Sequence, residues 1–205
     1  MTKIILTRHG HVEGIVPERF RGRLDFALTA TGKRQAELTA RRIASTWDPT
    51  AIYTSPLRRC TATGAAIGDL VGVKPRPDPR LSDIDYGAWQ GLTPDDARLR
   101  WPEEIELWYR APHLASIPEG ETLQLLLART AAAINEVVRL HPKDIVVLVG
   151  HDSVNRVLLT YALDLPLSHY WRLKQEPCAI SELSFDDGLF TVETINDAWH
   201  LKDIR

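Results

Sequence analysis

The sequence predicts an α/β protein, a three-layer α/β/α sandwich with a central, mostly parallel sheet. Two short apolar runs support this prediction, because Ile4 to Leu6 and Ile145 to Val149 are continuous aliphatic segments too short for helices. Such runs are typical of strands buried on both faces. Strand-like and helix-like segments alternate along the chain, which favours helices on both faces of the sheet. The 205 residues suit one domain, which we expect to span residues 1–205.

The first half of the chain alternates between short strands, loops and helices. Residues 10–25 are rich in glycine without any sustained period, which predicts a long loop, and such loops are often functional. Residues 29–45 carry apolar side chains at helical spacing, and 51–54 predict a short second strand. Ser55 and Pro56 suit an N-cap and a first helical position, so a helix is expected from there to about Val71.

The second half predicts a long helix, a buried strand and a terminal hairpin. A proline-rich connector at 75–79 leads to short helices between 93 and 109 that break at Pro102. Residues 121–140 predict the longest helix, followed by the strand that ends at Gly150 and a helix over 153–163. Two β-like runs, 179–185 and 189–195, are separated by Asp-Asp-Gly, which indicates a β-hairpin at or near a sheet edge.

Charge and composition exclude several classes of partner. The net charge of −2 gives no reason to expect a nucleic-acid or acidic-membrane surface. No apolar run is long enough to cross a bilayer, and the first residues lack a signal-peptide pattern. Cys60 and Cys178 are isolated, so a reduced, cytoplasmic location is expected, although a disulfide between them stays open. The oligomeric state is left open, with a homodimer as one option.

Two histidines end the two most apolar strands. Arg8-His9-Gly10 follows the first, and His151 follows the strand at 145–150. Because open α/β sheets bind ligands at the carboxyl ends of their strands, we expect His9 and His151 to meet at one sheet edge. A neutral imidazole is a good nucleophile toward phosphorus, and a neighbouring guanidinium binds phosphate oxygens and keeps the imidazole unprotonated. Arg-His-Gly taken alone favours a polar strand end with a solvated arginine and a capping histidine.

Further candidates lie on the segments that follow the predicted strands. Arg58 and Arg59 stand at the start of a predicted helix, where cations are unfavourable unless an anion is bound, and helical geometry does not choose between them. Asp83 and Asp85 are both candidate proton donors or turn carboxylates. A metal cluster of His9, His11 and His151 is disfavoured, because the arginines repel a cation.

Seven segments occur in an order that resembles a known family. They are Arg-His-Gly at 8–10, Arg-Phe-Arg-Gly at 19–22, Leu-Thr-Ala-Thr-Gly-Lys-Arg-Gln-Ala at 28–36, Ser-Pro-Leu-Arg-Arg-Cys-Thr-Ala-Thr at 55–63, Leu-Ser-Asp-Ile-Asp-Tyr-Gly-Ala-Trp-Gln-Gly at 81–91, Gly-Glu-Thr-Leu at 120–123 and Val-Gly-His-Asp at 149–152. Each is weak alone, but the ordered set resembles the histidine phosphatase superfamily in its phosphoglycerate mutase-like branch (branch 1). The resemblance covers nearly the whole chain.

The resemblance implies a role for individual residues. His9 would be the phosphorylated histidine and Asp83 the proton donor. Phosphate would be bound by Arg8, His151 and Arg59, since the family pattern selects Arg59 over Arg58. The remaining implied substrate-binding positions are Arg21 and Gly22. The sequence departs from the family in having Asp83 for the usual glutamate, Ile15 for a phosphate-binding asparagine, His11 for a glutamate or glutamine, and Asp152 for a frequent glycine.

The expected activity is hydrolysis of a small phosphomonoester through a phosphohistidine intermediate, with no metal or other cofactor. Two alternatives remain. A phosphoglycerate mutase would use the same residues and pass the phosphoryl group to a second hydroxyl. A non-catalytic module would bind a phosphorylated ligand without turning it over.

Overall fold

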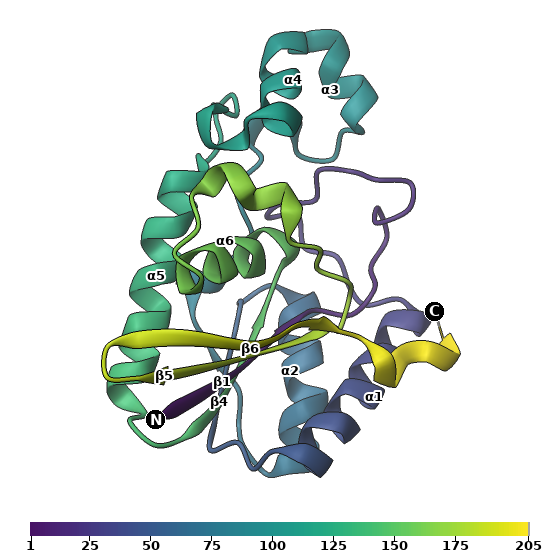
Figure 1. Ribbon diagram of the computed structural model, residues 1–205. Coiled ribbons are helices and arrows are strands. Elements are labelled where there is room, and N and C mark those ends of the chain that lie inside the picture. The colour runs from purple at the N-terminus through teal and green to yellow at the C-terminus, as the bar shows by residue number, and fades with distance from the viewer. Residues whose placement is uncertain (205) are drawn as a thin grey trace.

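A six-stranded sheet runs through the centre of the computed structural model, which describes residues 1–204 (Figure 1). The strands are β1 (Thr2–Arg8), β2 (Ala51–Thr54), β3 (Arg76–Pro77), β4 (Ile145–Gly150), β5 (Ile180–Asp186) and β6 (Leu189–Asp197). Their order is β3-β2-β4-β1-β5-β6, with the first four parallel and the last two antiparallel. The mostly parallel sheet and the hairpin at its edge confirm the predicted fold class.

Helices cover both faces of this sheet because alternate strand residues point to opposite sides. Ile4, Leu6, Val146 and Leu148 belong to one apolar cluster, together with side chains of α5 (Leu123–Leu140) and α6 (Asp152–Ala162). Their neighbours along the strands, such as Ile5, Val147 and Val149, belong to a second cluster with side chains of α1 (Ala30–Thr46) and α2 (Arg58–Val71). Burial on both faces explains why these strands are continuous apolar runs.

Most helices lie where the sequence predicts them, and their first residues are set by capping side chains. The hydroxyl of Thr29 accepts a hydrogen bond from the backbone N–H of Gly32 at the start of α1. The hydroxyl of Thr122 does the same for Leu125 at the start of α5. These caps place the helices within about two residues of the predicted bounds.

The predicted start of α2 is wrong. The helix begins at Arg58, and the Ser55 N–H instead donates to Val149 O at 3.0 Å, which continues the pairing of β2 with β4. Leu57, the residue just before the helix, makes no side-chain capping hydrogen bond. Asp25, from the loop after β1, accepts from the Arg58 backbone N–H at 2.9 Å and from its Nε at 2.8 Å. The Ser55 hydroxyl accepts from the Leu57 N–H at 3.3 Å, ahead of the helix, whereas the first helical N–H is bonded to a carboxylate distant in sequence.

The segment between α2 and α5 adds two short helices, α3 (Pro94–Arg100) and α4 (Pro102–Arg110), which stand apart from the layers at the top of Figure 1. We call them the cap. Their break at Pro102 was predicted. Aromatic rings join the cap to the rest of the protein, with ring centroids 4.8 to 6.3 Å apart in the group Phe20, Tyr86, Trp89, Trp108, Tyr170 and Trp171.

Within residues 1–204, no helix has the length and apolar character that a membrane span requires.

Cys60 and Cys178 are both buried and not bonded to each other, so the disulfide left open by the sequence does not form here.

Leu148→Ala tests the central packing. Leu148 is 1% exposed and lies opposite Leu6 and Tyr53 in the register of the neighbouring strands. Removing a buried leucine leaves a cavity, so the free energy of unfolding should fall by about 3 kcal/mol. The matched control is Leu99→Ala in the cap, where Leu99 is 85% exposed and the change should stay within about 0.5 kcal/mol. Denaturant unfolding measures both, and equal effects would contradict the assignment of this core.

Candidate functional site

The two histidines meet at the carboxyl edge of the sheet because β1 and β4 are adjacent and parallel. Arg8 lies opposite Gly150 in their register, so the next residues, His9 and His151, leave the sheet side by side. Their ring centroids are 5.2 Å apart, and both residues are almost completely buried. The expectation that opposite ends of the chain bring two histidines to one edge is therefore met.

The ring of His9 is held in one tautomer. Its Nδ1 lies 2.7 Å from the carbonyl oxygen of Gly10, and a carbonyl only accepts, so we assign the proton to Nδ1. In the neutral ring the lone pair is then on Nε2. Burial first, then electrostatic interaction with Arg59, with the neighbouring His151 ring and with Arg8, holds the pKa of His9 well below its usual value. His9 is thus an uncharged imidazole with a free Nε2 lone pair.

Gly10 lies in close contact with the start of α1. A Cβ on Gly10 would lie 2.3 Å from the carbonyl oxygen of Gly32, in the first turn of α1. The Gly10 N–H donates to the hydroxyl of Thr63 on α2, at 3.2 Å. Glycine is required at this position because the backbone of Gly32 leaves no room for a Cβ.

Arg59 is hydrogen-bonded to several groups of the site, whereas Arg58 lies outside it. The Arg59 side chain is fully buried and donates from Nε to His151 Nδ1 at 3.2 Å, from Nη1 to Leu24 O at 2.7 Å, and from Nη2 to Gly22 O and Asp83 Oδ2 at 2.7 and 3.0 Å. The Arg58 side chain is 66% exposed and pairs with Asp25. Burial distinguishes two arginines that helical geometry does not.

His151 is also a neutral imidazole. Its Nδ1 accepts from Arg59, so the proton belongs on Nε2, which lies 3.4 Å from the sulfur of Cys60. Burial and the positive charges of Arg59 and Arg8 hold the pKa of His151 well below its usual value. Burial raises the pKa of the Cys60 thiol, which stays protonated and donates to Gly150 O at 3.3 Å. The ring therefore has a fixed orientation beside His9.

Asp83, and not Asp85, reaches this cluster. Besides its pair with Arg59, Asp83 Oδ1 accepts from the hydroxyl of Ser153 and from the backbone N–H of Ile84. Its Oδ2 lies 3.5 Å from His151 Nδ1. Asp85 instead accepts from the Gly87 N–H at 2.9 Å and pairs with Arg23 at 3.3 Å. Of the two candidate carboxylates, Asp83 is therefore the one that lies beside Arg59 and His151.

Arg8 and Arg21 bring further guanidinium groups to the same edge. Arg8 Nη1 donates to Gln175 O at 2.7 Å and lies 3.6 Å from Asp152 Oδ1. Arg21 donates to Gly14 O, and burial together with the charge of Arg8 lowers its pKa. Among the residues that the structure describes, neither Nε has a hydrogen-bond partner although both are buried. Two buried N–H donors without partners are suited to an anion.

Gly22 shapes the loop that Arg59 holds. Its φ of +47° favours glycine, and a Cβ there would lie 2.7 Å from the Gln90 side-chain oxygen and 3.0 Å from Ile84 O. The Gly22 carbonyl accepts a hydrogen bond from Arg59, so this bond holds the loop against the Arg59 side chain.

Two departures from the family pattern have a structural explanation. Ile15 is half-buried and packs against an apolar cluster formed with α1 and the C-terminal residues, which includes Val12, Leu28 and Leu201. His11 Nδ1 lies 3.0 Å from the Thr29 hydroxyl at the N-cap of α1.

The described residues contain no group of three or more histidine, cysteine or acidic side chains arranged to hold a metal ion.

Sequence reasoning missed Ser153 and Arg129. Ser153 was treated only as the start of a helix, but its hydroxyl donates to Asp83. Arg129, on α5, donates to the carbonyl oxygens of Arg80, Ser82 and Asp83. The position of Ser153 directly after His151-Asp152 was a usable signal. Nothing local to Arg129 indicates that it reaches a segment more than 40 residues earlier.

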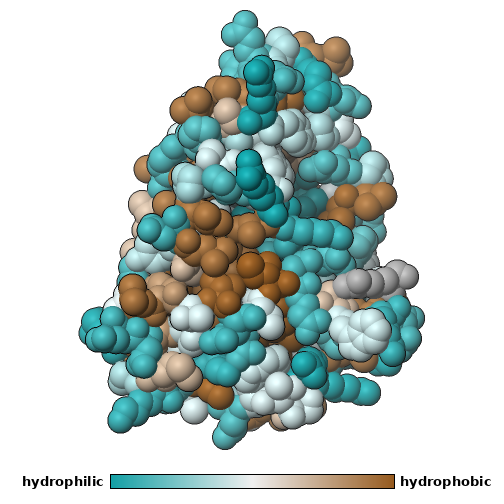
Figure 2. All heavy atoms as spheres, in the orientation of Figure 1, coloured by the Kyte–Doolittle hydropathy of each residue, from teal (hydrophilic) through white to brown (hydrophobic). Residues whose placement is uncertain are grey.

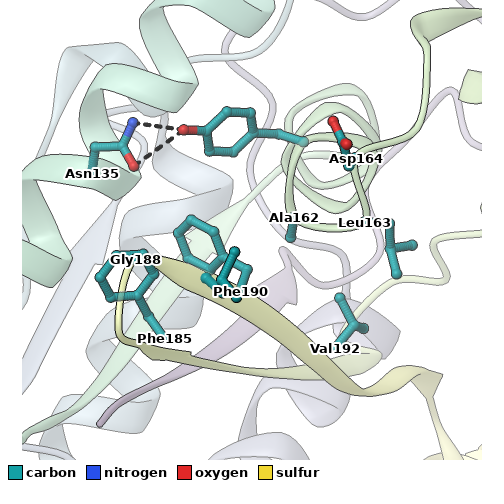
Figure 3. A pocket seen from close by; sticks show the side chains of 10 residues that line it. Asn135, Ala162, Leu163, Asp164, Phe185, Gly188, Phe190 and Val192 are labelled. Carbon is teal, nitrogen blue, oxygen red and sulfur yellow. Dashed lines mark hydrogen bonds between the residues drawn. The ribbon is translucent and has the colours of Figure 1, made fainter.

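A separate hollow lies at the other end of α6, away from His151. It has a volume of about 560 Å³ and lies between that helix end, α5 and the β5–β6 hairpin, lined by residues such as Tyr161, Phe185 and Phe190 (Figure 3). Apolar side chains gather over the same region in Figure 2. Its only charged lining residue is Asp164, so it lacks the groups for phosphate chemistry.

Comparison with known proteins gives consistent matches over the full length. The family model described as Histidine phosphatase superfamily (branch 1) matches residues 4–198. Phosphoserine phosphatase 1 from Hydrogenobacter thermophilus is 29% identical over 201 residues, covering 98% of this chain and 95% of that protein. Probable phosphoglycerate mutase GpmB from Proteus mirabilis is 32% identical over 214 residues, covering 100% and 97%.

Solved structures agree with these matches. YhfR from Bacillus stearothermophilus superposes with a TM-score of 0.93 at 29% identity, covering 98% of this chain and 100% of that one. A mycobacterial glucosyl-3-phosphoglycerate phosphatase superposes with a TM-score of 0.86 at 26% identity, covering 96% and 99%. The relatives therefore include both phosphatases and mutase-like proteins.

The buried neutral histidines predict a loss of stability in mild acid. The pKa values of His9 and His151 are lowered in the folded state, so below about pH 6.5 the unfolded chain binds more protons than the folded one. The free energy of unfolding should thus fall with pH from about 6.5 downward, by up to about 1.4 kcal/mol per pH unit for each histidine. Denaturant unfolding between pH 7.5 and 5.5 measures this slope.

The control for this measurement is His9→Gln. This variant loses the contribution of His9 to the pH dependence of the free energy of unfolding and keeps the contribution of His151. An unchanged slope in His9→Gln would contradict a lowered pKa for His9.

Proposed function

Because this chain belongs to the histidine phosphatase superfamily (branch 1), we propose that it hydrolyses a small phosphomonoester through a phosphohistidine intermediate. The observation that carries this proposal is the state of His9. Its Nδ1–H is bonded to Gly10 O, its Nε2 lone pair is free, and its charge is suppressed by burial among arginines. An imidazole in that state is a nucleophile toward phosphorus.

In the first step, His9 Nε2 attacks phosphorus in line with the leaving oxygen. Arg8, Arg59 and His151 bind the equatorial oxygens and stabilise the transition state, which spreads negative charge over them. Asp83, in its protonated form, gives a proton to the leaving alkoxide. Arg21 and Gly22 contact the substrate from the loop after β1, where the Arg21 Nε has no protein partner among the described residues.

In the second step, water attacks the phosphohistidine. Asp83, now a carboxylate, accepts a proton from this water, and the P–N bond breaks to return His9 to its neutral form with release of phosphate. Fixed guanidinium groups supply the charge stabilisation that Mg²⁺ supplies in kinases, so the proposed reaction needs no metal.

Named relatives of this chain act on small phosphorylated molecules. One is named for phosphoserine and another for glucosyl-3-phosphoglycerate. We propose that the substrate here is a phosphorylated small molecule of comparable kind.

Mutase activity is the second candidate, favoured by the relative named as a probable phosphoglycerate mutase. Such a reaction uses the same residues and passes the phosphoryl group to another hydroxyl instead of water. The family resemblance implies extra substrate-binding segments in longer mutases between the donor motif and the Gly-Glu-Thr helix start, and this chain is compact there. It covers 97% of the GpmB relative, however, so chain length does not separate it from that protein.

A phosphorylated His9 is the central prediction. Incubation with an aryl phosphate in EDTA, followed by a mildly alkaline quench, should yield an acid-labile phosphoryl group on His9. His9→Ala should abolish the labelling and lower kcat at least about 1,000-fold, because no nucleophile remains. Phosphopeptide mapping and phosphate release measure the two effects.

The outcomes separate the candidates. Absence of both turnover and phosphoenzyme would leave only a non-catalytic binding module, and turnover lost in EDTA would indicate a metal. With 2,3-bisphosphoglycerate and a phosphoglycerate, isomer exchange faster than phosphate release would identify a mutase.

Asp83→Asn tests the proton donor. An alkyl leaving group needs protonation and an aryl one needs little, so the variant should slow alkyl phosphates about 100-fold and aryl phosphates far less. Steady-state kcat/KM for both substrate types gives the ratio. Asp85→Asn is the matched control, since Asp85 pairs with Arg23 outside the cluster. Equal slowing of both substrates by Asp83→Asn would show that another group donates the proton.

A further inference from the structure

Arg129 uses every N–H of its guanidinium group on one short segment of chain and one carboxylate. Its Nε and Nη2 donate to the two oxygens of Glu121 at 2.6 and 2.7 Å. Its Nη1 donates to the carbonyl oxygens of Arg80 and Ser82, both at 2.7 Å, and its Nη2 donates to Asp83 O at 3.0 Å. A guanidinium has five N–H donors, and these bonds account for all of them.

Glu121 holds the same segment from its other end. Its backbone N–H donates to Asp85 O at 2.8 Å, and its side chain accepts from the Asp85 N–H at 3.3 Å. The Arg129 and Glu121 side chains are 18% and 9% exposed, so this bidentate pair is shielded from solvent. Together the two residues bond to the backbone of residues 80, 82, 83 and 85.

This arrangement surrounds the proposed proton donor. Asp83 has one methylene fewer than the glutamate usual at this position, so its carboxyl reaches His151 and Arg59 only if its backbone is well placed. Its side chain has just two rotatable bonds, which gives little freedom to compensate for a shift of the main chain. The carbonyl of Asp83 itself is one of the groups that Arg129 fixes.

We propose that Arg129, oriented by Glu121, is a positioning residue that fixes the main chain at 80–83 and thereby aims the Asp83 carboxyl at the leaving oxygen. The inference rests on the proposed phosphatase function. Lysine would not substitute, because a compact ammonium lacks the planar fork that spans a carboxylate and three carbonyl oxygens.

The test compares an alkyl phosphate, glycerol 1-phosphate, with p-nitrophenyl phosphate. Arg129→Gln should lower kcat/KM about 30-fold for the alkyl substrate and less than about 3-fold for the aryl one, since a displaced acid matters only where the leaving group needs a proton. Arg129→Lys should behave like Arg129→Gln. Glu121→Gln, a milder change that keeps one acceptor oxygen, should show the same selectivity at about 5-fold.

A double-variant cycle separates positioning from general support of the fold. In an Asp83→Asn background the donor is already absent, so Arg129→Gln should add less than about 3-fold with either substrate. Arg139→Gln is the matched control, because Arg139 lies on the same helix with its side chain 70% exposed. Near-ultraviolet circular dichroism and thermal unfolding check that each variant is folded.

Three results would overturn the inference. These are equal slowing of both substrates by Arg129→Gln, full additivity with Asp83→Asn, and, should Arg129→Gln fail to fold, a Glu121→Gln variant that shows no selectivity. Wild-type protein that turns over neither substrate would instead overturn the proposed function itself. Wild-type turnover with selective loss in Asp83→Asn, but not in the Arg129 and Glu121 variants, would reject the positioning role alone.

Discussion

The parallel pairing of β1 with β4 is the contact on which the rest of the site depends. Its register sets Arg8 opposite Gly150, so the two following histidines leave the sheet edge together, although register partners such as Ile5 and Val147 are 142 positions apart in the chain. Packing on both faces favours that register, because a shift of β1 by one residue would exchange the side chains that fill two differently shaped apolar clusters. The site is thus positioned by core packing.

Positive charge and burial then determine the chemical state of the site. Arg59 connects His151, Asp83 and the loop carbonyls of Gly22 and Leu24. Its charge and the exclusion of water keep both imidazoles neutral, as the proposed role of His9 as a nucleophile requires. Uncompensated cations in a buried place are costly, and an anionic ligand offsets that cost. A phosphate ester is an anion of this kind.

Residues 80–85, called the donor segment because they carry the proposed proton donor Asp83, are organised separately from the sheet. Residues 80–85 form no long helix or strand, so their backbone groups need partners from elsewhere. α5 supplies them through Arg129, and Glu121, just before that helix, completes the set. The same helix packs one face of the sheet, so the donor segment and the histidines share one rigid support.

The sequence by itself determined the fold class, the parallel strands, the terminal hairpin and the histidine pair, because apolar runs, spacing and turn residues are local patterns. Tertiary structure alone decided that Asp25 caps α2, that Gly10 accommodates the backbone of Gly32, that Asp83 and not Asp85 joins Arg59, and that Arg129 supports the donor segment. Each of these depends on a hydrogen-bond partner or a close approach from a distant part of the chain. Such partners are selected by which backbone and side-chain groups the packed fold brings within about 3 Å, a distance that local pattern does not encode.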